Sequence, residues 1–204
     1  MSKRLTPSFP LTLELFMKKL IALTVGAGFA LGAAATPENY IIDNNHTFAR
    51  FEYSHFGLSR QVSHFDKTSG TITLDRAART GAVEVSIDAT SVNTGNGELN
   101  KHIQDADFFD TKKYPAITFK STKMHFKGDV PASVDGNLTV KGVTKPVTLD
   151  IATLKCMPHP MLKKEACGAN ATTTIRRSDF NAGKYAPGVS DDVTLSIAVE
   201  AVKQ

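Results

Sequence analysis

Apolar and polar side chains alternate with a period of two along most of the chain after residue 35. The alternation is clearest over 83–88, 147–152 and 192–201, where every second residue is apolar. Further strand candidates cover 46–55, 69–75, 116–126, 134–141 and 171–177. Since each segment has one apolar face, the pattern predicts about eight antiparallel strands that bury one side.

One segment departs from this period. Leu99, Ile103 and Ala106 recur at helical spacing within 98–110. We therefore expect one or two short helices, the clearer one over 98–110. The chain should leave the helix near Tyr114, because a residue that precedes proline disfavours the helical conformation.

Strands of this number and pattern predict a mainly β fold, and a single antiparallel β-barrel fits it best. Closing a sheet removes its exposed edges, and an eight-stranded barrel can enclose one small ligand. No repeat, linker or change of composition divides residues 36–204, so we expect one domain there.

The first 35 residues have the pattern of an export signal. Lys18 and Lys19 precede an apolar run over 20–31, and alanines at 33–35 provide a cleavage site. We predict a cleaved signal peptide over 1–35 and a periplasmic protein. Met17 opens a compact signal by itself, so translation can start at Met1 or at Met17. A retained anchor is the alternative, although the run is short for a spanning helix.

The charge of the chain changes once this signal is set aside. The 204 residues include 24 Lys and Arg and 20 Asp and Glu, of which four and one lie within 1–35, so residues 36–204 carry a net charge of +1. A nearly neutral domain lacks the basic surface that nucleic-acid binding requires. We expect no nucleic-acid partner. Because no later apolar run could span a bilayer as a helix, we also expect no integral membrane protein.

Cys156 and Cys167 are the two cysteines of the chain. Export to an oxidising compartment favours a disulfide between them. The alternative is a metal site that adds His159, but it lacks a fourth ligand and the close cysteine spacing of structural zinc sites. We predict the disulfide and no metal.

The sequence contains no nucleophile elbow, phosphate-binding loop or dinucleotide fingerprint. We therefore predict neither catalysis nor a cofactor. The aromatic residues are more informative: Phe51, Tyr53, Phe119 and the adjacent Phe108 and Phe109 can line an apolar pocket. Ordinary core packing is the alternative for each ring.

Four motifs follow one another across residues 40–193. They comprise Tyr40, Asp43 and His46 with Phe51, Tyr53 and His55; the run Ala106-Asp107-Phe108-Phe109-Asp110 with Lys113-Tyr114-Pro115; Gly136 and Leu138 with the unbroken run Gly142-Val143-Thr144-Lys145-Pro146; and Arg177-Ser178-Asp179-Phe180 with Ser190-Asp191-Asp192. In this order they resemble the YceI-like family of bacterial periplasmic polyisoprenoid-binding proteins.

The resemblance implies an extended, lipocalin-like barrel whose long hydrophobic cavity binds isoprenoid lipids without catalysis. We expect seven apolar or aromatic residues to line that cavity: Phe51, Tyr53, Val85, Phe108, Phe109, Phe119 and Leu138. For the polar head group of the ligand, we expect contacts from His46, His55 or Arg177 near the mouth.

We accordingly predict a protein that binds, and carries or stores, an isoprenoid lipid of polyprenyl or quinone type. Two alternatives remain open. One is an enzyme or redox helper that acts on a bound quinone or isoprenoid, and the other is a stress-linked module that binds another small amphiphile. The sequence also leaves a homodimer open.

Overall fold

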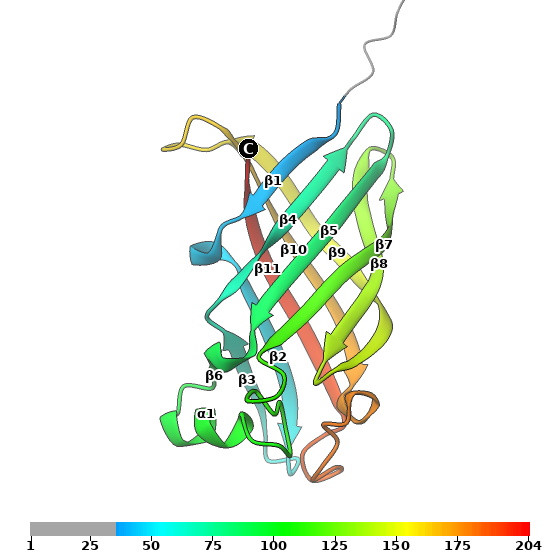
Figure 1. Cartoon of the computed structure of the whole chain (residues 1–204). Coiled ribbons are helices and arrows are strands. Elements are labelled where there is room, and N and C mark those ends of the chain that lie inside the picture. Colours follow the sequence, from blue (N-terminus) through cyan, green and yellow to red (C-terminus); the bar gives the residue numbers. More distant parts are fainter. Residues whose placement is uncertain (1–35) are drawn as a thin grey trace, which may run out of the picture. The chain divides into compact units, whose positions relative to one another are not determined.

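Eleven strands and one α-helix make up most of residues 36–204, the part of the chain that the computed structural model describes (Figure 1). The predicted signal peptide over 1–35 lies outside these residues. The strands are β1 (Glu38–Ile42), β2 (Phe48–His55), β3 (Ser59–Phe65), β4 (Thr68–Asp75), β5 (Thr80–Asp88), β6 (Val92–Asn93), β7 (Ala116–Lys127), β8 (Val130–Val140), β9 (Val143–Pro158), β10 (Glu165–Arg176) and β11 (Asp192–Lys203). The helix α1 spans Gly97–Ile103, and the short 3-10 helices η1, η2 and η3 span Asn44–His46, Ala89–Ser91 and Arg177–Phe180.

The strands close into an antiparallel barrel with eight positions around its wall. The order is β1-β4-β5-β7-β8-β9-β10-β11, and β11 pairs back with β1. The other three strands continue this wall, because β2 also pairs with β11, β3 pairs with β2, and β6 pairs with β3. Three positions therefore hold two strands each, β1 with β2, β3 with β4 and β5 with β6. The predicted eight-stranded barrel is confirmed.

The three interrupted positions break at the same level of the wall. The main-chain N–H of Asp66, between β3 and β4, donates to the carbonyl of Ser91 in η2 at 3.1 Å. The N–H of Thr68 donates to the side-chain oxygen of Asn44 in η1 at 2.6 Å. These bonds satisfy groups that the broken ladders leave free, so the wall stays continuous across the breaks.

Alternation along each strand directs one set of side chains into the barrel. In β11, the inward set runs from Val193 to Ala201 at every second residue. Where Phe119 of β7 crosses β8, residue 136 is glycine, and a Cβ there would lie 2.4 Å from the phenyl ring. The absence of a side chain at Gly136 therefore gives Phe119 its place inside the barrel.

The helix is shorter than the predicted 98–110. The side chain of Asn96 accepts hydrogen bonds from the N–H groups of Glu98 and Leu99 at 3.0 Å, which fixes the start of the helix. The helix ends at Ile103, and the carbonyl of this residue accepts a bond from the N–H of Phe109 at 3.1 Å. The chain thus folds back after Ile103 in a series of turns and returns Phe109 to the barrel.

Cys156 and Cys167 form the predicted disulfide. They face each other directly across β9 and β10, and only residues 159–164 connect the two strands. The bond consumes both sulfurs and leaves the alternative metal site without thiolate ligands. Among residues 36–204, no helix has the length and apolar character needed to cross a membrane.

Candidate functional site

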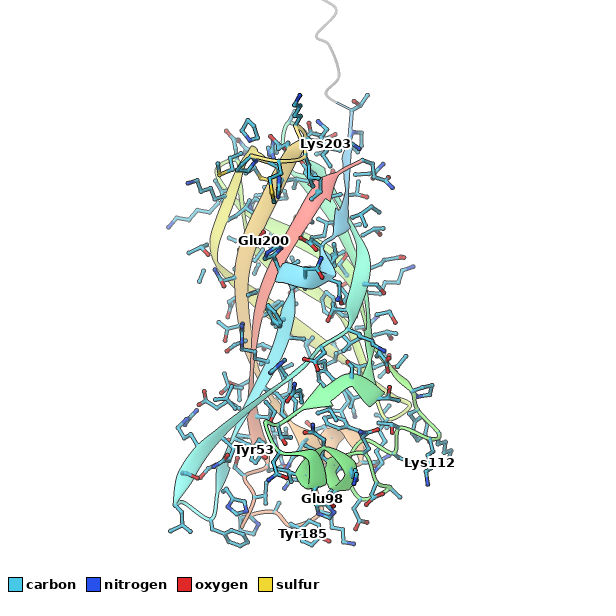
Figure 2. All side chains as sticks on the ribbon, turned by 90° about the vertical axis from the view of Figure 1, so that its left-hand side faces the viewer. Tyr53, Glu98, Lys112, Tyr185, Glu200 and Lys203 are labelled. Atoms are coloured by element: carbon cyan, nitrogen blue, oxygen red, sulfur yellow. A yellow bond between two sulfur atoms is a disulfide. The ribbon has the colours of Figure 1, made fainter. Side chains whose placement is uncertain are left out.

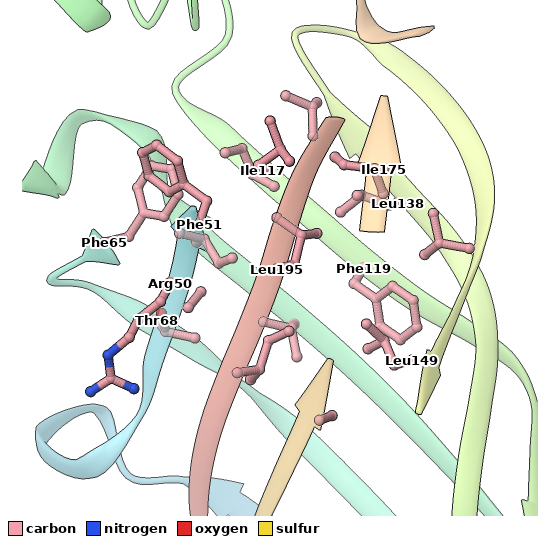
Figure 3. Close-up of a pocket in the computed structure, with 18 of the residues that line it drawn as sticks. Arg50, Phe51, Phe65, Thr68, Ile117, Phe119, Leu138, Leu149, Ile175 and Leu195 are labelled. Atoms are coloured by element: carbon pink, nitrogen blue, oxygen red, sulfur yellow. The ribbon is translucent and has the colours of Figure 1, made fainter. Parts of the chain in front are cut away.

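The barrel encloses an apolar cavity of about 590 Å³, within the range of ~300–1,000 Å³ that is typical of small-ligand pockets. It extends from Tyr40 and Ala201 at one end of the barrel to Leu99 and Tyr185 at the other. Figure 3 shows Phe119, Leu138 and other aliphatic and aromatic side chains converging from several strands. The cavity can therefore surround an elongated apolar molecule.

Three phenyl rings form a cluster in the part of the wall near α1. The ring centroids of Phe51 and Phe65 lie 5.5 Å apart, and that of Phe109 lies 5.7 Å from Phe51 and 5.4 Å from Phe65. These distances are typical of favourable aromatic pairs. Since Phe109 comes from the turns after α1, the cluster joins this segment to β2 and β3.

Charged side chains close the end of the barrel near the chain's C-terminus, where Figure 2 labels Lys203. Tyr40 is 1% exposed. Its hydroxyl donates to Glu165 Oε1 at 2.5 Å and lies 2.8 Å from Glu38 Oε2. Arg76 Nη2 donates to Glu165 Oε1 at 3.0 Å, and Lys203 Nζ donates to Glu38 Oε1 at 2.6 Å. Two cations and two carboxylates thus balance each other. We call these five residues the polar cap.

The hydrogen bonds of the polar cap shift the acidities of its members. The bond from Lys203, with that from Tyr40, lowers the pKa of Glu38. The bond from Tyr40, followed by that from Arg76, lowers the pKa of Glu165. Burial, reinforced by both carboxylates, raises the pKa of Tyr40. At neutral pH the carboxylates are therefore ionised, and the phenol keeps its proton.

Arg177 organises the opposite end of the cavity, which we call the mouth. Its Nε donates to the carbonyl of Ser190 at 2.8 Å, Nη1 to those of Ala182 and Lys184, the latter at 2.8 Å, and Nη2 to that of Val189 at 2.7 Å. A guanidinium has five N–H donors, so one N–H of Nη2 is left over from these four bonds. Burial lowers the pKa of Arg177, and the charge of Asp191 opposes that effect.

All seven residues that we expected to line the cavity do so: Phe51, Tyr53, Val85, Phe108, Phe109, Phe119 and Leu138. His55 and Arg177 also line it, at the mouth. His46 lies instead on η1, where its Nδ1 is 2.7 Å from Asp43 Oδ2, and it does not line the cavity. A role for any of these residues in ligand binding stays a prediction.

The polar cap escaped the sequence analysis, although the alternation carries a signal for it. Glu38 precedes Tyr40 and Ile42 by two and four residues, so it lies on the inward face of β1. Lys203 follows the buried Ala201 in the same way. Charged residues at inward positions near both ends of the described residues thus indicated a polar closure of the barrel.

Known proteins match this chain over most of its length. Residues 40–201 match the YceI-like domain. Protein YceI of Escherichia coli O157:H7 is 37% identical over 190 residues, which cover 92% of this chain and 98% of that protein.

Solved structures show the same fold. The Campylobacter jejuni YCEI protein is 32% identical, with a TM-score of 0.65 over 74% of this chain and 90% of that one. A polyisoprenoid binding domain from Saccharophagus degradans, implicated in plant cell wall breakdown, has a TM-score of 0.59 at 19% identity, over 81% of this chain and 98% of that one.

Proposed function

The chain belongs to the YceI-like family, and on this premise we propose that it binds an isoprenoid lipid of polyprenyl or quinone type inside the barrel and carries or stores it in the periplasm. The observation that carries the proposal is the apolar cavity of about 590 Å³, which extends from the mouth to the polar cap. The polyisoprenoid binding of the Saccharophagus degradans domain supports the ligand class, and the predicted export signal supports the compartment.

The chemistry of the cavity suits an isoprenoid tail. Such a tail is a branched hydrocarbon without hydrogen-bonding groups, so it gains from being removed from water at ~25 cal/mol per Å² of apolar surface. The wall offers Val, Ile, Leu and Phe side chains from every strand position. Since unpaired polar groups in the wall would be costly to bury against hydrocarbon, this lining favours the tail over a polar molecule of equal size.

The two ends of the cavity give the ligand a direction. The polar cap is already internally paired, so an apolar tail can abut it but a head group finds no unpaired charge there. The mouth offers His55 and the remaining N–H of Arg177. We therefore propose that the tail points toward Tyr40 and that a polar oxygen of the head group lies near Arg177.

We propose binding without catalysis. Tyr40 and Arg177 are polar residues of the cavity wall, and both are engaged in hydrogen bonds that hold the wall together. Their geometry accounts for a closed end and an ordered mouth, which are the requirements of a container.

Titration of the delipidated protein tests this function. A polyprenol and a long-tailed quinone should each bind saturably with one molecule per barrel, and affinity should rise with tail length until the cavity is filled. The matched control is the quinone ring without its tail, which should bind far more weakly. Equal affinity for the ring alone, or turnover of the bound quinone, would contradict a container and favour the redox alternative.

A further inference from the structure

Exposed apolar side chains surround the mouth of the cavity. Leu58 is 85% exposed, Phe56 is 64% exposed and Tyr185 is 48% exposed. Phe56 and Tyr185 also line the cavity, together with Leu99 of α1. We call these four residues the mouth patch. Since Phe56, Leu99 and Tyr185 belong to both the outer surface and the cavity wall, the patch connects the apolar interior directly with the surroundings of the protein.

The two aromatic residues of the mouth patch hold conformations that bulky residues rarely adopt. Phe56 has a φ of 52° and Tyr185 a φ of 70°, both in the left-handed region. The N–H of Phe56 donates to the carbonyl of Gly188 at 2.6 Å, and a Cβ on Gly188 would lie 2.7 Å from the ring of Phe56. The ring of Tyr185 stacks on Phe108 at 5.8 Å.

These contacts fix both rings at the surface. An exposed phenylalanine at the tip of a hairpin is unfavourable for two reasons. Its apolar ring is in contact with water, and its backbone has a left-handed conformation that bulky residues disfavour. Positions that break several local rules at once tend to be functional, so we expect the mouth patch to contact a partner.

Three cations near the patch are paired with carboxylates. Arg60 of β3 pairs with Glu52 of β2, Lys184 pairs with Asp107, and Lys101 pairs with Glu98 at 2.9 Å. Each of these cations near the mouth thus has an acidic neighbour. The attraction that the patch can offer is apolar.

We propose that the mouth patch docks on a lipid bilayer and inserts Phe56 and Leu58 into it while the ligand enters or leaves. The inference rests on the proposed function, because an isoprenoid lipid is insoluble in water and resides in a bilayer until a protein binds it. Docking through the patch would place the cavity opening against the hydrocarbon, so the tail could move without crossing water. Exposed apolar patches mark protein contacts, membrane contacts or ligand-binding grooves, and the ring of a tyrosine such as Tyr185 suits the membrane interface.

The opposite end of the barrel provides a matched control. The turn between β9 and β10 lies at the end remote from α1 (Figure 1) and exposes Met161 by 80% and Leu162 by 54%. Lys163 and Lys164 follow directly. This turn has similar apolar exposure but adjacent cations, so binding through it would depend on anionic lipid and weaken with salt.

The test is sedimentation of the delipidated mature protein with phosphatidylcholine vesicles that contain no isoprenoid. Replacing Phe56 and Leu58 together with serine should lower the vesicle-bound fraction about tenfold or more, given the apolar surface removed. Replacing Met161 and Leu162 with serine should leave that fraction unchanged, and salt should have little effect. Leu58→Ser alone, which changes a nearly fully exposed side chain, should show part of the loss.

A fluorescence measurement gives an independent readout, because the chain contains no tryptophan. The emission of Phe56→Trp should shift to the blue when vesicles are added, whereas that of Leu162→Trp should not. A blue shift confined to Leu162→Trp, or vesicle binding that survives the loss of Phe56 and Leu58, would overturn the proposal.

Two further outcomes separate this proposal from its alternatives. If the wild type binds no vesicles and is a dimer that Phe56→Ser with Leu58→Ser converts to a monomer, the occupant is a second copy of the chain and the bilayer is excluded. Leu58→Ser, which leaves the lining of the cavity intact, should still bind a solubilised polyprenol with wild-type affinity. Loss of vesicle binding with normal polyprenol binding thus reports on docking, whereas a wild type that binds vesicles but no polyprenol contradicts the proposed function instead.

Discussion

Filling the cavity from one of its smallest lining residues should abolish the binding of long tails. Ala171 of β10 lines the cavity between Ile151 of β9 and Ile197 of β11, its partners in the two neighbouring strands. An indole at this position would project into the space that we assign to the tail. In Ala171→Trp, we therefore expect the ligand to lose at least one five-carbon unit from the cavity.

The size of the effect follows from the surface that is lost. Five carbons at ~0.8 kcal/mol each amount to about 4 kcal/mol of transfer free energy, or about a thousandfold in affinity, for a tail that fills the cavity. The new side chain enters a cavity of about 590 Å³. The fold should therefore lose no more than the ~1–3 kcal/mol that is typical of added core volume.

The assay is equilibrium titration with polyprenols of increasing length, after circular dichroism and urea unfolding have shown that each variant is folded. Thr172→Trp is the matched control. Thr172 follows Ala171 in β10, but its side chain lies on the exposed outer face of the strand. Only Ala171→Trp should bind less tightly, and short polyprenols should be affected least. Unchanged affinity for long polyprenols in a folded Ala171→Trp would refute the assignment of the tail to the barrel.

Three further predictions concern the end of the barrel that holds the polar cap. Reducing the bond between Cys156 and Cys167 should lower the free energy of unfolding by about 3 kcal/mol, since the bond closes a short loop; calorimetry with and without reductant would disprove this by showing equal melting temperatures. Tyr40→Phe should cost about 1–3 kcal/mol in urea unfolding, because two carboxylates lose their phenol partner, and a wild-type midpoint would contradict the observed network. The folded-state pKa values of Glu38 and Glu165 are lowered, so their contribution to stability is present above the unfolded pKa of ~4.3 and is lost as the pH falls through the folded pKa. A Glu165→Gln protein should therefore lose less stability between pH 7 and pH 3 than the wild type. Equal losses would argue against this assignment.

The sequence predicted the strands in which burial alone sets the pattern. β5, β9 and β11 alternate because one face meets the cavity and the other meets water. β3 does not alternate in this way: its first four residues are all exposed, including Val62, and its inward residues include the polar Ser63. β6 has two residues, too few to show any period. Such strands are defined by pairing with their neighbours, which the local sequence does not specify.

Helical spacing was a poor guide to the end of α1. Ala106 continues the spacing of Leu99 and Ile103, yet the chain turns after Ile103 because its carbonyl and that of Gln104 accept bonds from Phe109 and Thr111. These bonds depend on the packing of Phe109 against Phe51 and Phe65 in the barrel. A tertiary contact therefore overrides the local periodicity.

The candidate site likewise has a part that the sequence predicted and a part that it did not. Its apolar lining was predictable because aromatic and aliphatic residues follow the alternation and match the motifs of the family. For the polar cap, the alternation marks Glu38 and Lys203 as inward residues, but it does not show that they meet. Their proximity depends on closure of the barrel, in which β1 pairs with β11 and Tyr40 lies opposite Lys203. The outward place of His46 likewise follows from the break between β1 and β2 at η1, which the motif alone does not indicate.

Lipid extraction from the protein purified from the cells that naturally produce it tests the central claim most directly. Mass spectrometry of the solvent extract should find one isoprenoid lipid in near-stoichiometric amount, chemically unchanged after prolonged incubation with the protein. Ala171→Trp, purified in the same way, should yield far less of it. Recovery of fatty acids or phospholipids in place of an isoprenoid, or equal recovery from Ala171→Trp, would contradict an isoprenoid container built around the barrel cavity.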